Sequence, residues 1–186
     1  MKRLAIFASG NGTNAEAVIR HFKNHKEIEV ALIASNNAAA YVLQRAKHHD
    51  IPSLTFDKEL YREGLTDILK EKKITHIVLA GFLWLIRPEL LREFPQAINI
   101  HPSLLPKYGG RGMYGNRVHE AVKAAGEKET GITIHRVNEA YDKGKIILQK
   151  KTTIESDDSP EDIANKVHDL EHRWFPPAIE EWVLAG

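Results

Sequence analysis

The sequence predicts an α/β fold built on one mostly parallel twisted sheet, and three observations point to it. Short apolar runs alternate with segments of helical periodicity from residue 4 to residue 80, which favours a parallel sheet covered by helices on both faces. Two β-rich runs then follow one another near the C-terminus, so we expect an antiparallel C-terminal extension of the sheet. No linker-like segment divides the 186 residues, which predicts a single domain over residues 1–186.

The first expected strand covers residues 4–8, a continuous apolar run that ends in the turn Ser9-Gly10-Asn11-Gly12. Such a run is typical of a buried strand that turns directly into a helix. Thr13 or Asn14 is expected to cap that helix, which ends near residue 21. The further strands are expected at 29–34, 52–56, 77–80, 97–100, 130–137 and 145–154.

Helices are expected between and after these strands. One follows the turn at 35–38 and ends near residue 49, and another covers 58–72. The apolar residues that share a face of the second of these are Leu60, Leu65, Ile68 and Leu69. Pro88 is expected to begin a short helix, because proline is tolerated in the first turn. Later helices are expected at 117–125 and from the start signal at 157–161 to about residue 182.

The segment 101–115 is rich in glycine and proline, which predicts a long ordered loop at the end of the fifth strand. Long loops at strand ends in such sheets usually carry function.

Composition restricts the class of function. Lys and Arg number 26 against 25 Asp and Glu, a net charge of +1, which gives no electrostatic reason to expect nucleic acid or a membrane surface as a partner. The chain has no cysteine, which excludes disulfides, thiolate metal sites and cysteine nucleophiles and fits a reducing compartment. The N-terminal apolar run is too short for a signal peptide, and no segment approaches the roughly 20 apolar residues of a membrane helix. We therefore expect a globular cytoplasmic protein.

The turn from Gly10 to Ala15 joins the first expected strand to the first helix. Free backbone N–H groups and the positive end of a helix dipole make such a turn a phosphate site. Its spacing also fits the dinucleotide fingerprint, but that fingerprint requires an acidic residue at the end of the second strand, where Ala34, Ser35 and Asn36 stand. A monophosphate is favoured over a dinucleotide, and a purely structural turn is the remaining alternative.

The run Asn-Ile-His-Pro-Ser-Leu-Leu-Pro at 99–106 ends the fifth expected strand. Residues two apart in a strand point to the same side, so Asn99 and His101 are expected to project together at its carboxyl end. An amide beside an imidazole suits an anionic tetrahedral intermediate, because the amide stabilises the oxyanion and the imidazole moves a proton. The alternative is a histidine satisfied by the adjacent turn, and the proline-bracketed loop favours the catalytic interpretation.

Asp142 lies in the expected turn between the last two strands. A carboxylate there can accept a hydrogen bond from a histidine, favour its charged form and position water. An ordinary turn aspartate followed by Gly144 is an equally good interpretation of this segment by itself.

The segment His168-Asp169-Leu170-Glu171-His172 fits the H-x-x-E-H pattern of some zinc peptidases. Such an enzyme also needs an acidic ligand well downstream, and too few residues follow His172 for one. No metal is expected here. Glu171 instead faces a substrate cleft or forms part of a polar helix face.

Three segments in this order, 9–14, 99–108 and 131–144, resemble the folate-dependent formyltransferases, in particular the phosphoribosylglycinamide formyltransferase family of purine biosynthesis. The resemblance extends over about residues 3–180 and implies a Rossmann-like formyltransferase fold. It further implies transfer of the formyl group of 10-formyltetrahydrofolate to the primary amine of glycinamide ribonucleotide, without a metal. The expected partners are these two small molecules, and the expected assembly is a monomer or a homodimer.

The resemblance also implies a role for individual residues. Asn99, His101 and Asp142 are the implied catalytic trio, in which Asn99 and a protonated His101 stabilise the oxyanion and Asp142 assists proton transfer. The implied substrate-binding residues are Gly12, Thr13 and Asn14 at the phosphate and Glu171 at the ribose. The implied folate-binding residues are Phe82, Leu83, Trp84, Leu85, Ile86, Ala140 and Tyr141.

The chain departs from the family pattern at three places. Trp84 stands where relatives often carry a basic residue, the loop 109–115 is longer than usual, and His168 takes a place often filled by an amide or an acid. Rival functions within formyl chemistry are a formyltetrahydrofolate hydrolase and a formyltransferase acting on initiator tRNA or an amino sugar. The resemblance implies an extra domain for the hydrolase and for the tRNA enzyme, which this sequence does not include. The rivals outside formyl chemistry are a dinucleotide-dependent oxidoreductase and a phosphate-ligand binding domain.

Overall fold

The computed structural model describes all 186 residues and contains one seven-stranded sheet. The strands are β1 (Lys2–Phe7), β2 (Ile28–Ser35), β3 (Ser53–Thr55), β4 (His76–Leu79), β5 (Ala97–His101), β6 (Glu129–Arg136) and β7 (Ile146–Thr153). Their order in the sheet is β3-β2-β1-β4-β5-β6-β7. The first five pair in parallel, whereas β6 and β7 are added antiparallel. The expected parallel sheet with an antiparallel C-terminal extension is confirmed.

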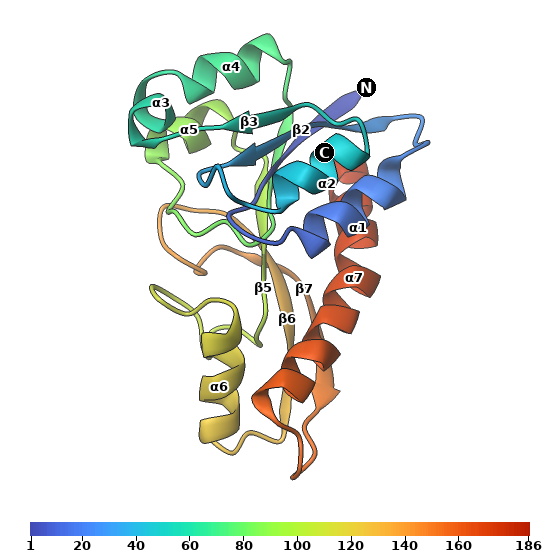
Figure 1. Ribbon diagram of the computed structural model, residues 1–186, viewed down its shortest axis with the longest axis vertical. Helices are drawn as coiled ribbons and strands as arrows, with labels where there is room; N and C mark the ends of the chain where they lie inside the picture. The colour runs from blue at the N-terminus through green and yellow to red at the C-terminus, as the bar shows by residue number, and fades with distance from the viewer.

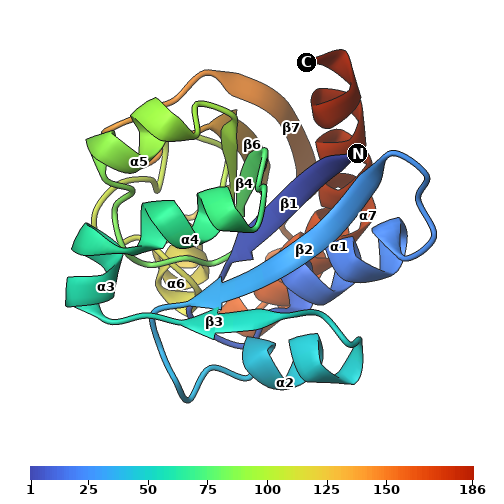
Figure 2. The same ribbon diagram turned by 90° about the horizontal axis from the view of Figure 1, so that it is seen from above.

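Helices cover both faces of this sheet. They are α1 (Thr13–Phe22), α2 (Val42–His48), α3 (Lys58–Glu63), α4 (Leu65–Glu71), α5 (Pro88–Glu93), α6 (Asn116–Ala124) and α7 (Pro160–Ala185). Figures 1 and 2 show α1, α2 and α7 on one face and α3, α4 and α5 on the other. None of these helices combines the length and the apolar character that crossing a membrane requires.

Each face of the sheet has its own hydrophobic core. Leu4 and Ile6 of β1 pack in the core under α1, α2 and α7, and Ala5 and Phe7 pack in the core under α3, α4 and α5. All four side chains are fully buried, as the continuous apolar run of a central parallel strand predicts. A third, small cluster joins α6 to the start of α7 through Val118, Val122, Ile154 and Ile163.

The single helix expected at 58–72 is wrong, because Gly64 divides it into α3 and α4. The Gly64 N–H donates to the Leu60 carbonyl at the end of α3, and the Gly64 carbonyl accepts from Ile68 at the start of α4. Gly64 has φ −131° and ψ −19°, which are not helical values, and glycine itself disfavours a helix interior.

The side-chain cap expected from Thr13 or Asn14 is also wrong. The helix α1 begins at Thr13, and its N-cap is Gly12 at φ 76° with no side-chain hydrogen bond. A Cβ at Gly12 would lie 2.4 Å from Val42 Cγ2, which shows how tightly the first residue of α2 packs on this turn. By contrast, the start signal of α7 is confirmed, because Ser159 Oγ accepts from the Asp162 N–H at 3.1 Å.

Candidate active site

A cavity of about 600 Å³ lies at the carboxyl ends of β1, β4 and β5. Its walls are the turn after β1, the segment after β4, the loop after β5 and the turn after β6. Every residue to which the sequence assigned a role lines it: Gly12, Thr13, Asn14, Phe82, Leu83, Trp84, Leu85, Ile86, Asn99, His101, Ala140, Tyr141, Asp142 and Glu171. Ligand sites in open α/β sheets lie at this edge.

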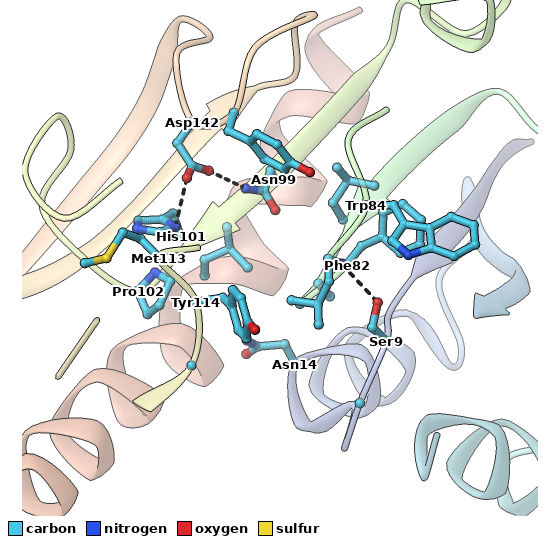
Figure 3. Close-up of a pocket in the computed structure, with 18 of the residues that line it drawn as sticks. Ser9, Asn14, Phe82, Trp84, Asn99, His101, Pro102, Met113, Tyr114 and Asp142 are labelled. Atoms are coloured by element: carbon cyan, nitrogen blue, oxygen red, sulfur yellow. Dashed lines mark hydrogen bonds and ion pairs between the residues drawn. The ribbon is translucent and has the colours of Figure 1, made fainter. Parts of the chain in front are cut away.

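The carboxylate of Asp142 lies between the Asn99 amide and the His101 imidazole (Figure 3). Asn99 Nδ2 donates to Asp142 Oδ1 at 3.4 Å, and His101 Nδ1 lies 3.5 Å from Asp142 Oδ2. The structure therefore brings together three side chains that come from two distant segments of the chain.

Two glycine-containing loops hold Asp142 in place. The Gly110 N–H donates to Asp142 Oδ2 at 2.9 Å, and a Cβ at Gly109 would lie 3.3 Å from the Asp142 Cβ. A Cβ at Gly144 would lie 1.6 Å from the Arg136 carbonyl oxygen, so only glycine fits the turn that follows. Asp142 itself has a φ of 55°, a left-handed conformation that non-glycine residues adopt mainly where surrounding structure enforces it.

His135 is a member of this cluster that the sequence analysis did not identify. It pairs directly with Asn99 across β5 and β6, and its Nε2 lies 3.1 Å from Asn99 Nδ2 and 3.5 Å from an Asp142 oxygen. Its Nδ1 donates to the Arg136 carbonyl at 2.9 Å, so Nε2 of the neutral ring is an acceptor for Asn99. The register of β6 against β5 is what places His135 opposite Asn99.

Burial sets the charge state of His101. Its Nε2 lies 2.7 Å from the Tyr108 carbonyl oxygen, which can only accept, so Nε2 carries the hydrogen and Nδ1 of the neutral ring is free. Burial lowers the pKa of His101, and the Asp142 charge opposes this without reversing it. The ring is therefore neutral in the free protein at pH 7, so the protonated His101 expected at the oxyanion must gain its proton during the reaction.

Asp142 is ionised beside these rings. Burial by itself raises the pKa of this carboxyl, but its polar neighbours, among them the Gly110 N–H donor, hold the pKa below its usual value. A proton that arrives at His101 Nδ1 is accordingly stabilised by a carboxylate 3.5 Å away.

The turn after β1 presents main-chain donors to the other end of the cavity. The N–H groups of Gly10, Asn11 and Gly12 donate to no backbone carbonyl, and the first turn of α1 adds free N–H groups of its own. Arg45 of α2 fixes the turn from behind, since its guanidinium donates to the Asn11 carbonyl and to Asn11 Oδ1, each at 2.8 Å. Such a turn binds an anion such as a phosphate.

The segment after β4 is held rigidly along a third wall. Ser9 Oγ accepts from the Leu83 N–H at 3.0 Å (Figure 3). It also donates to Asn36 Oδ1 at 2.6 Å. The Tyr61 hydroxyl donates to the Leu85 carbonyl at 2.8 Å. Trp84 packs edge-on against the Tyr61 ring at a centroid distance of 5.4 Å. An aromatic wall of this kind suits a flat heteroaromatic ligand.

A shallower groove of about 440 Å³ continues from this wall. It is lined by Lys58, Tyr61, Arg62, Trp84, Leu85 and Tyr141. Two of these side chains are cationic, so the groove offers binding partners to carboxylates.

The residues of the H-x-x-E-H pattern face different surroundings. Glu171 is buried against the cavity, whereas His172 is exposed and His168 is half-exposed. No three His, Cys, Asp or Glu side chains are arranged to hold a metal ion. Burial raises the pKa of Glu171 to about 7, and a hydrogen bond from Asn14 opposes the shift.

Comparisons with known proteins agree on one family. The formyl transferase family model matches residues 2–179. A Bacillus subtilis (strain 168) protein named phosphoribosylglycinamide formyltransferase is 37% identical over 189 residues, covering 97% of this chain and 94% of that protein. The crystal structure of phosphoribosylglycinamide formyltransferase from Bacillus halodurans superposes with a TM-score of 0.88 at 41% identity, covering 97% of this chain and 94% of that one. Glycinamide ribonucleotide transformylase 1 from Geobacillus kaustophilus also has a TM-score of 0.88, at 34% identity over 100% of both chains.

Proposed function

We propose that Asn99, His101 and Asp142 carry out the catalysis in this chain. The chain belongs to the formyl transferase family and has the phosphoribosylglycinamide formyltransferase activity of purine biosynthesis. The formyl donor of the family is a folate, and 10-formyltetrahydrofolate is the donor we propose. In the reaction, the amine nitrogen of glycinamide ribonucleotide forms a bond to the formyl carbon and the bond from that carbon to the folate nitrogen breaks. One proton moves from the amine to the folate nitrogen.

His101 carries this proton. Its free Nδ1 accepts the proton that the attacking amine loses, and the charged ring is stabilised by the Asp142 carboxylate 3.5 Å away. The same Nδ1–H then donates the proton to the departing folate nitrogen. This sequence requires a neutral ring at the start, which agrees with the direction of its pKa.

Asn99 stabilises the oxyanion. Its Nδ2 contact with Asp142 is long at 3.4 Å, and a hydrogen bond of that length is weak. The hydrogen in that contact is therefore available to the negative oxygen that develops on the formyl carbon. His135 holds the other Nδ2 hydrogen at 3.1 Å and so orients the amide.

The two substrates enter from opposite sides of this cluster. The nucleotide phosphate binds the N–H groups of Gly12, Thr13 and Asn14, with its ribose towards Glu171. The folate ring system lies against residues 82–86 and 140–142, and its glutamate carboxylates extend along the groove towards Lys58 and Arg62. A monomer or homodimer in the cytosol remains the prediction from the sequence.

The observation that carries the proposal is that one cavity contains a phosphate turn at one end and the cluster around Asp142 at the other. The test is to mix the protein with glycinamide ribonucleotide and 10-formyltetrahydrofolate and to follow deformylated folate by absorbance. Asn99→Ala is expected to lower kcat by roughly a hundredfold, the usual effect of removing an oxyanion donor. Asn165→Ala, the same change at an exposed position of α7, is the matched control and should keep near-normal kcat.

Three outcomes contradict parts of the proposal. Absence of folate turnover by the unaltered protein contradicts the activity itself. Near-normal kcat of Asn99→Ala at saturating substrates contradicts the oxyanion role. Comparable Michaelis constants for the nucleotide and its dephosphorylated form contradict phosphate binding at the turn after β1.

A further inference from the structure

Three buried polar groups at one end of the cavity have hydrogen-bonding capacity that the protein does not use. His119 Nδ1 and Asn14 Oδ1 are buried with no partner, and the neighbouring Glu171 is 5% exposed, with its Oε2 4.0 Å from His168 Nε2. All three residues line the cavity. Buried polar atoms in folded proteins are nearly always paired, so a cluster of unpaired ones indicates a ligand that supplies the partners.

His119 is the member of this cluster that neither the motifs nor the resemblance identified. It lies on α6 between Val118 and Val122, which anchor the helix in the small core formed with α7. The side chain is only 2% exposed, and its ring centroid lies 6.4 Å from that of His168. Burial lowers the pKa of His119 to about 4, and the nearby His168 and His101 rings act in the same direction. The ring is therefore neutral under physiological conditions.

The chemistry of these groups suits sugar hydroxyls rather than phosphate. A neutral imidazole offers one donor and one acceptor, and Asn14 Oδ1 is an acceptor. A phosphate dianion has no hydrogen to donate, so it cannot satisfy an unpaired acceptor. A hydroxyl both donates and accepts, and two neighbouring hydroxyls can pair with several such groups at once.

We propose that His119 is a substrate-binding residue that hydrogen-bonds a ribose hydroxyl of the nucleotide, alongside Asn14 and Glu171. The inference rests on the proposed function, which supplies the ribonucleotide. It assigns α6 a direct contact with the substrate.

The test compares glycinamide ribonucleotide with its 2′-deoxy and 3′-deoxy analogues in steady-state assays. His119→Leu is expected to raise the KM of the ribonucleotide roughly tenfold, the effect of losing one hydrogen bond in a buried site, while kcat is unchanged. The preference of the unaltered enzyme for the ribonucleotide over at least one deoxy analogue should nearly disappear in this variant. His119→Gln, which keeps a donor and an acceptor, should retain part of it. His172→Leu, the same change at an exposed ring of α7, is the matched control and should leave both the KM and the preference for the ribonucleotide unchanged.

Thermal unfolding separates this role from a structural one. His119→Leu replaces an unpaired buried polar group by an apolar one, so its Tm should equal or exceed that of the unaltered protein. A lower Tm, together with an equal loss of kcat/KM for the ribonucleotide and both deoxy analogues, would mean that His119 only supports the fold. An unaltered enzyme that does not discriminate against either deoxy analogue, or a His119→Leu variant that keeps the preference, overturns the inference. Absence of formyl transfer by the unaltered protein instead overturns the proposed function.

Discussion

Replacing Gly12 by alanine tests how closely the phosphate turn depends on its contact with α2. The added Cβ would lie 2.4 Å from Val42 Cγ2, 2.5 Å from Val42 Cβ and 2.9 Å from Val42 Cα. The residue also has a φ of 76°, where side chains other than glycine are strained. We expect Gly12→Ala to lower stability and to displace the N–H groups that we propose bind the phosphate.

Two energetic costs together give the expected loss of stability in Gly12→Ala. The left-handed backbone costs about 1–2 kcal/mol for alanine, and overpacking against a buried neighbour costs about 1–3 kcal/mol. Together they predict a loss of about 2–5 kcal/mol, or a fall in Tm of about 5–20 °C for a chain of this size. Because α2 must move or the turn must open, the KM of the nucleotide should rise while the KM of the folate changes little.

The assay combines thermal unfolding with steady-state kinetics for both substrates. Gly10→Ala is the matched control in the same turn, since a Cβ there meets nothing within 4 Å. Its Tm should be unchanged or slightly higher, because alanine restricts the unfolded chain. Adding Val42→Ala to Gly12→Ala removes only the outermost of the three contacts, so it should not restore the Tm.

Two results would refute this reasoning. Equal Tm values for Gly12→Ala and Gly10→Ala would mean that the turn relaxes without cost. Full recovery of the Tm on adding Val42→Ala would mean that the alanine Cβ clashes with the methyl groups of Val42 and not with its main chain.

Two further predictions concern pH. Asp142→Asn removes the charge that favours protonated His101, so kcat/KM should fall at least about tenfold. The acidic limb of the pH profile of kcat/KM should also move to lower pH. An unchanged pH profile would contradict the proposed proton path. Burial lowers the pKa of His76 to about 4, so the unfolded chain binds a proton at this residue at higher pH than the folded chain does. The free energy of unfolding should therefore decline as pH falls from about 6.5 to about 4, and His76 should account for about 1–3 kcal/mol of the decline. Urea unfolding of His76→Phe should show a weaker decline over that range than the unaltered protein, and the same substitution at exposed His48 should leave the decline as it was.

Much of the fold could be predicted because its strands are continuous apolar runs. Residues 4–8 and 77–80 are buried on both faces, so their composition identifies them without knowledge of the partners. Gly64 is the main failure. The apolar spacing around it fits one helix, and only the backbone angles of Gly64, φ −131° and ψ −19°, show that two short helices meet there.

The site was predictable where a single strand or turn positions the residues. Asn99 and His101 project together because they are two apart in β5, and the phosphate turn directly follows β1. The partnership of His135 with Asn99 depends on the register of an antiparallel pair, which the sequence does not specify. The neutral state of His101 and the unpaired nitrogen of His119 arise from burial by distant segments, so no local pattern reveals them.

The hydroxyl of Ser9 connects two walls of the cavity. Through its bond with the Leu83 N–H, it joins the turn where we propose that the nucleotide binds to the segment where we propose that the folate lies. Whatever factor the nucleotide imposes on the dissociation constant of the folate, the folate must impose the same factor on the nucleotide. The ternary complex therefore has the same free energy whichever of the two molecules binds first.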